Sequence, residues 1–94
     1  MRTPLNIHHN PRALRFEAHI DGHLCEASYE LVDGTMWMVH TGVPAALQGR
    51  GIAAELVRTA LEHARAQGLK VHPACSYVRA YLRRHPEYRD LLDD

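Results

Sequence analysis

The sequence has 94 residues, of which 46% are hydrophobic and 23% are charged. This length suits one domain with one hydrophobic core, and the composition is that of a globular protein rather than a disordered or fibrous chain. Eleven basic and eleven acidic residues give a formal net charge of zero. A neutral chain argues against nucleic acid or a membrane surface as the partner.

Cysteine content and hydropathy indicate the compartment. Two cysteines, Cys25 and Cys75, are too few for a disulfide framework. The N-terminal sequence lacks the basic and apolar regions of a secretory signal, and no apolar run approaches the ~18 residues that a membrane span needs. We therefore expect a cytoplasmic protein that is a monomer or a weak dimer. From residue 49 onward eight basic residues face six acidic ones, which suits a small polyanionic ligand.

The first half of the chain predicts strands. Residues 1–13 are rich in Pro, Asn and His and predict an irregular lead-in, with a short edge strand near residues 5–7. Residues 15–20 and 25–31 alternate between apolar and polar side chains, as half-buried strands do. An Asp-Gly pair after each of them predicts a tight type I′ turn. A third strand, over residues 36–43, is apolar on both faces for much of its length and is expected to be central.

The second half begins with a helical period. An apolar stripe at a spacing of 3.6 residues predicts an amphipathic helix over residues 50–67, ended by Gly68 in a left-handed conformation. Residues 69–75 predict a fourth strand, which lies parallel to the third after a right-handed crossover. Ser76 is the expected N-cap of a second helix, which His85-Pro86 ends. The tail predicts another helical turn.

The predicted fold class is therefore α/β (α+β). An antiparallel three-stranded meander is followed by a β-α-β crossover and a short C-terminal helix, in a single domain over residues 1–94.

The entry to the long helix is the segment that carries most information about function. It consists of Gln48, Gly49, Arg50, Gly51, Ile52 and Ala53. The first turn of a helix leaves backbone N–H groups unpaired, and the helix dipole adds partial positive charge there. Glycines allow a phosphate to approach the backbone closely, and Arg50 adds a full charge. The same pattern also occurs as a plain glycine-containing loop in many α/β domains.

The motif in this loop resembles that of a known family. Gln48-x-x-Gly51-x-Ala53 matches the Q/R-x-x-G-x-G/A signature of the GNAT superfamily of N-acetyltransferases. From about residue 16 to residue 92, the chain is similar to the short, single-domain branch of that superfamily. The further matching elements are His40-Thr41, Val43-Pro44, Pro73-x-Cys75-x-Tyr77 and His85-Pro86.

The resemblance implies a GNAT-like fold with acetyl-CoA or coenzyme A as the cofactor, in a cleft where the third and fourth strands splay apart. The pyrophosphate would lie on the amides of residues 48–53, and the pantetheine arm would pair with the backbone near Val43. Cys75, at the end of the strand that borders the cleft, is expected beside the cofactor.

Three residues are candidates for chemistry. The resemblance makes Tyr81 a general acid for the leaving thiol, although its spacing also fits a core tyrosine. The helix N-terminus next to Cys75 lowers a thiol pKa, so Cys75 is a candidate nucleophile or a thiol for a mixed disulfide, or else a small buried residue. His40 continues the every-other-residue spacing of Met36 and Met38 on the third strand and is either a general base or a structural histidine.

Position 42 departs from the pattern of the branch, whose members often carry an acidic residue there. Gly42 cannot act as a base, which leaves a base acting through water, His40, or no base at all. The eight histidines lack the spacing of metal ligands, so no metal site is expected. Arg79, Arg83 and Arg84 either meet the 3′-phosphate of coenzyme A or form a solvated face.

Three functions remain open at this point. The chain is an N-acetyltransferase acting on a primary amine of an unknown small molecule or protein, or a non-catalytic or weakly catalytic module that binds acetyl-CoA or coenzyme A. The third is a protein-interaction domain that keeps the fold without the ligand.

Overall fold

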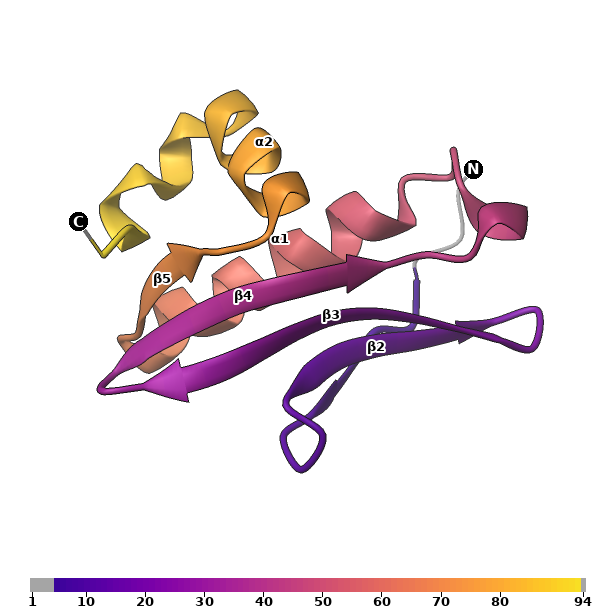
Figure 1. Ribbon diagram of the computed structural model, residues 1–94, viewed down its shortest axis with the longest axis horizontal. Coiled ribbons are helices and arrows are strands. Elements are labelled where there is room, and N and C mark those ends of the chain that lie inside the picture. Colours follow the sequence, from indigo (N-terminus) through magenta and orange to yellow (C-terminus); the bar gives the residue numbers. More distant parts are fainter. Residues whose placement is uncertain (1–4, 94) are drawn as a thin grey trace.

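The computed structural model describes residues 5–93 and contains a five-stranded sheet with helices on one side (Figure 1). The strands lie in chain order across the sheet: β1 (His8–Asn10), β2 (Arg15–Ile20), β3 (His23–Val32), β4 (Thr35–Gly42) and β5 (Lys70–Pro73). Neighbours from β1 to β4 are antiparallel, and β5 runs parallel to β4. The mixed α/β fold class is confirmed, as is the crossover to a parallel strand.

The helical segments occupy the second half of the chain. They are η1 (Ala45–Leu47), α1 (Ile52–Gln67), α2 (Ser76–Arg84) and η2 (Pro86–Leu91), where η marks a 3-10 helix. Gly68 ends α1 with a φ of 69°, as predicted. The predicted cap of α2 is wrong by one residue, because Cys75 holds the N-cap position and Ser76 is already helical. The extra helical turn expected in the tail is η2.

The two Asp-Gly turns have the predicted geometry. Asp21 and Gly22 both have positive φ, 52° and 78°, and Asp33 and Gly34 repeat this with 49° and 80°. Positive φ at both central residues is the mark of a type I′ turn, whose twist matches that of the flanking strands.

The edge strand lies later than expected. The sequence predicted it near residues 5–7, of which all are described, but the structure places β1 at His8–Asn10. His9 explains the shift, because its ring stacks on Phe16 at 4.3 Å and its Nε2 lies 2.6 Å from the Tyr29 hydroxyl. The expected irregular lead-in at residues 1–4 lies outside the described residues.

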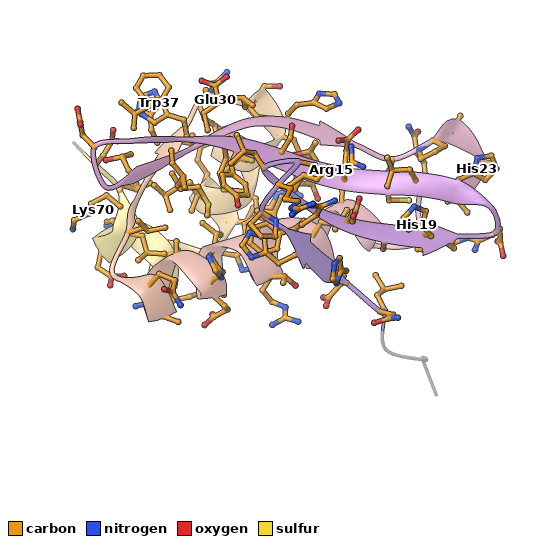
Figure 2. All side chains as sticks on the ribbon, turned by 90° about the horizontal axis from the view of Figure 1, so that it is seen from below. Arg15, His19, His23, Glu30, Trp37 and Lys70 are labelled. Atoms are coloured by element: carbon orange, nitrogen blue, oxygen red, sulfur yellow. The ribbon has the colours of Figure 1, made fainter. Side chains whose placement is uncertain are left out.

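The core lies between α1 and one face of the sheet. From α1 it takes Ile52, Leu56, Val57, Ala60, Leu61 and Ala64. From the sheet it takes Phe16, Cys25, Ala27, Tyr29, Met36, Met38 and Val71. The opposite face of the sheet carries side chains that stay partly exposed. Figure 2 shows two of them, Glu30 and Trp37, side by side and directed away from α1.

A bulge interrupts β4 at Val39. Tyr29 of β3 pairs with Met38 and Ser28 pairs with His40, so within the described sheet Val39 is an extra residue without a partner. The spacing of the sequence predicted His40 on the same face of the strand as Met36 and Met38, and this prediction is wrong. Since one extra residue reverses the alternation beyond it, Thr41 shares the core face and His40 lies on the open face.

The ladder between β4 and β5 stops short of the end of β4. Its last pair is Met38 with Pro73, followed by a bond from the Cys75 amide to the Met38 carbonyl at 2.9 Å. Beyond it β4 continues to Gly42, while the other chain turns away into α2 (Figure 1). The strands thus separate at this end of the sheet, as the resemblance implied.

Candidate functional site

A cavity of about 460 Å³ opens where β4 and β5 separate. One wall is the end of β4, with Thr41, Gly42 and Val43, and the opposite wall is the start of α1. The remaining lining residues are Leu47, Gln48, Gly49, Gly51, Ile52, Ala53, Ala54 and Tyr77. The cavity therefore contains most of the residues predicted to hold a cofactor, brought together from a strand end, a loop and a helix N-terminus.

The loop leaves backbone donors directed out of the helix start. Gly49 and Gly51 have φ values of 84° and 77°, and Gly51 is the N-cap of α1 with no side-chain capping bond. The first bond of the helix runs from the Glu55 amide to the Gly51 carbonyl. Within the part of the chain that the structure describes, the amides of Ile52 and Ala53 have no protein acceptor. These vacant donors are the arrangement that binds anions.

Two details of the loop differ from the sequence-based expectation. The Gln48 amide is not vacant, because it donates to the Ala45 carbonyl at 3.3 Å and closes η1. The Gln48 side chain donates from Nε2 to the Val43 carbonyl at 3.2 Å. That carbonyl is the one expected to pair with a pantetheine arm, so a ligand would have to share it with Gln48 or replace Gln48.

Arg50 is exposed beside the loop. Its Nη1 lies 3.5 Å from Oδ2 of Asp21, which belongs to the turn between β2 and β3. Both side chains are more than half exposed, 55% and 69%, so this pair contributes little to stability.

Cys75 lies between the last β4–β5 pair and the start of α2. Its Sγ is 3.7 Å from Thr41 Oγ1, and Thr41 lines the cavity. Burial alone would raise the pKa of the Cys75 thiol, but hydrogen bonds from the Val78 amide, the Thr41 hydroxyl and the Tyr77 amide together lower it below its ordinary value. The half-buried thiol is thus biased toward the thiolate, as a helix N-terminus predicts.

The two tyrosines of α2 occupy different environments. Tyr77 is 39% exposed and lines the cavity. Tyr81 is buried, and its ring stacks on His85 with 4.1 Å between centroids. Burial raises the pKa of both phenols. Among the described residues that line the cavity Tyr77 is present and Tyr81 is absent, so the sequence pointed to one tyrosine and missed the other. The available signal for Tyr77 was that it lies four positions before Tyr81, on the same helix.

The remaining candidates lie at the margins. His40 is exposed on the open face of the sheet, where the Ser28 hydroxyl donates to its carbonyl at 3.5 Å. Arg79 is held by the carbonyls of Pro73 and Ala74, at 3.1 and 2.8 Å. All three arginines Arg79, Arg83 and Arg84 are exposed, and the side chain of Arg79 satisfies backbone carbonyls at the end of β5.

Within residues 5–93, no three His, Cys, Asp or Glu side chains gather as metal ligands do. In the same range, no helix is both long and apolar enough to cross a membrane.

Comparison with known proteins identifies the fold and the family. The family model described as GCN5-related N-acetyl-transferase matches residues 15–91. The chain is 34% identical to protein NATD1 of Homo sapiens over 86 residues, which cover 88% of this chain and 76% of that protein. It is 32% identical to protein NATD1 of Danio rerio over 95 residues, 96% of this chain and 86% of that one.

A solved structure agrees with these matches. The solution NMR structure of a GCN5-like protein from Staphylococcus aureus superposes with a TM-score of 0.76 at 30% identity. The superposition covers 95% of this chain and 88% of the other.

Proposed function

The chain belongs to the GCN5-related N-acetyltransferase family, and on that premise we propose that it transfers an acetyl group from acetyl-CoA to a primary amine. The cavity at the end of β4 would hold the cofactor, with the pyrophosphate on the glycine loop. The amine belongs to a small molecule or to a protein.

The vacant amides at the start of α1 are the observation that carries this proposal. The amides of Ile52 and Ala53 have no protein acceptor among the described residues, and Gly51 caps the helix without a side chain. An anion there gains hydrogen bonds and the favourable end of the helix dipole. The residues of the loop fit a diphosphate, because glycines at positions 49 and 51 keep side chains out of its path and Arg50 adds a positive charge.

When bound, acetyl-CoA would supply the thioester carbonyl that an amine attacks. The chain would contribute a proton acceptor for the amine and a proton donor for the departing sulfur. His40 is the proposed acceptor, acting directly or through a water molecule. For the donor we propose Tyr81, as the family resemblance implies, or Tyr77, whose place in the cavity wall is the better supported of the two.

Cys75 has a proposed role beside the cofactor. Its lowered thiol pKa and its contact with Thr41, a residue that lines the cavity, support this role. Such a thiol can act as an acyl-carrying nucleophile or form a mixed disulfide with coenzyme A.

Ligand-dependent stability tests the proposal. We expect acetyl-CoA and coenzyme A to raise the melting temperature, whereas an unrelated nucleotide should not. At a hundredfold excess over Kd, either ligand should increase the free energy of unfolding by about 2.7 kcal/mol. Arg50→Glu should weaken this effect, because it places a negative charge beside the diphosphate. Absence of stabilisation by either thioester or thiol would reject cofactor binding altogether.

An assay of thiol release then separates this enzymatic function from a second candidate function, that of a module that binds the cofactor without turning it over. The burial of Tyr81 away from the cavity favours that alternative. Stabilisation by acetyl-CoA without thiol release across a panel of amines would establish it. If turnover is observed, Tyr77→Phe and Tyr81→Phe decide between the two proposed proton donors, since only loss of the true donor lowers kcat.

A further inference from the structure

Gly42 is a glycine whose backbone does not require one. The other five glycines, at positions 22, 34, 49, 51 and 68, have positive φ, where a side chain is strained. Gly42 is not among the residues with positive φ, and it pairs with Glu26 at the regular end of the β3–β4 ladder. An alanine would be compatible with this backbone, so the reason for the missing side chain lies in what surrounds it.

The space beside Gly42 is filled by His40. A Cβ built on Gly42 would lie 2.9 Å from Nε2 of His40, closer than real Cβ contacts come. Cγ of Glu26, from the neighbouring strand, would lie 3.7 Å from the same point. The imidazole therefore lies along β4 over position 42, and the Glu26 side chain borders the same space.

This places a ring nitrogen against a residue that lines the cavity, on the open-face side of β4. Gly42 itself lines the cavity, together with Thr41 and Val43, whereas His40 and Glu26 are not among its described lining residues. The Glu26 carboxylate is 3.7 Å from Nη1 of Arg15, whose Nε is bonded more closely to Glu17 at 2.8 Å. Glu26 and His40 thus both border the space over Gly42 on the open face of the sheet, the side from which we expect a cationic amine to approach.

We propose that Gly42 is a positioning residue for His40, which leaves the space that the imidazole needs in order to lie against the cavity-lining end of β4 and accept a proton from the acceptor amine. The proton transfer rests on the proposed function, but the position of the His40 ring over Gly42 does not depend on it. In the transfer, the ammonium of the acceptor loses one proton and His40 gains it.

Gly42→Ala tests this directly. The new methyl group meets only the end of a flexible side chain, so the fold should persist and the His40 ring should swing away. In two-dimensional NMR we expect a contact between the His40 ring protons and the Gly42 Hα protons in the unaltered chain, and a changed environment for the His40 ring in the variant. Ser28→Ala is the matched control, since Ser28 bonds the His40 carbonyl rather than the ring.

Kinetics complete the test. Gly42→Ala should lower kcat on the order of 100-fold or more, the range of a lost general base, and leave the KM for acetyl-CoA unchanged. In a His40→Ala background it should add nothing, because both changes remove one interaction. His40 resonances that are unchanged by Gly42→Ala, or independent effects of the two substitutions, would overturn the proposal. Failure of acetyl-CoA to stabilise the unaltered chain would instead overturn the proposed function, whatever the position of the ring.

Discussion

Gly51 and Gly34 have nearly the same left-handed backbone, with φ values of 77° and 80°, but only Gly51 lines the cavity. Replacing either by alanine should lower the free energy of unfolding by about 1 kcal/mol, the cost of a left-handed L-residue. Gly51→Ala should in addition abolish most of the thermal stabilisation by coenzyme A, since its methyl group obstructs the approach of a phosphate to the amides of α1.

Paired melting curves measure both effects. Gly34→Ala serves as the matched control, because a Cβ at this position meets nothing within 4 Å. It should shift the melting temperature of the free protein by a similar amount and retain the full response to ligand. Equal responses to coenzyme A in the two variants would show that the phosphate does not bind at this loop.

Among the elements, β4 decides where the site forms, and its bulge at Val39 is the decisive feature. A bulge bends and twists its strand, and this one lies one residue after Met38, the last residue of β4 that pairs with β5. We infer that the bend helps to keep the end of β4 apart from the segment that follows β5, and so keeps the cavity open.

Deletion of Val39 would restore a regular ladder between β3 and β4. We expect a folded protein with weaker or no response to coenzyme A, because a straighter β4 closes the space between the strands. Val39→Ala is the control, since it removes the side chain, which is 38% exposed, and keeps the extra backbone residue. Hydrogen exchange of the amides at residues 39–43 together with ligand-induced melting shifts would report the change. An unaltered ligand response after the deletion would contradict it.

At the scale of the whole molecule, local patterns predicted most of the fold. The alternation of apolar residues located β2 and β3, a run that is apolar on both faces located β4, the Asp-Gly pairs located the hairpins, and the 3.6-residue stripe located α1. What failed depends on contacts between distant residues. The position of β1 follows from the contacts of His9 with Phe16 and Tyr29, and the bulge at Val39 leaves no mark in an apolar strand.

The candidate site divides in the same way. The glycine loop could be predicted, because its spacing reports a local backbone requirement and matches a family motif. The cavity contact of Tyr77 could not, since Tyr77 and Tyr81 share a helix face in sequence and differ only in how α2 packs. The face of the sheet on which His40 lies likewise depends on the bulge, which reverses the alternation that the sequence suggested.

Tyr88 connects the C-terminal segment to α1, and its ionisation should lower the stability of the whole fold at alkaline pH. The Tyr88 hydroxyl donates to Oε2 of Glu62 at 2.6 Å, and only 5% of the residue is exposed. Burial and the hydrogen bond to Glu62 raise the pKa of Tyr88 from 10.0 to about 12. Above pH 10 the unfolded chain releases this proton while the folded chain retains it, so stability is full below pH 10 and declines as the pH rises toward 12.

Urea unfolding at pH 8 and near pH 11.5 measures this loss, to which Tyr88 should contribute on the order of 2 kcal/mol. Tyr88→Phe should be less stable than the unaltered chain at pH 8, by about 1 kcal/mol for the lost hydrogen bond, and should lose less between the two pH values. Burial also raises the pKa values of Tyr29, Tyr77 and Tyr81. These residues contribute to both proteins, so the difference between the two proteins isolates Tyr88. If the two proteins lose equal stability over this interval, the Tyr88 proton is not retained by the fold, and the contact with Glu62 does not hold the C-terminal segment on α1.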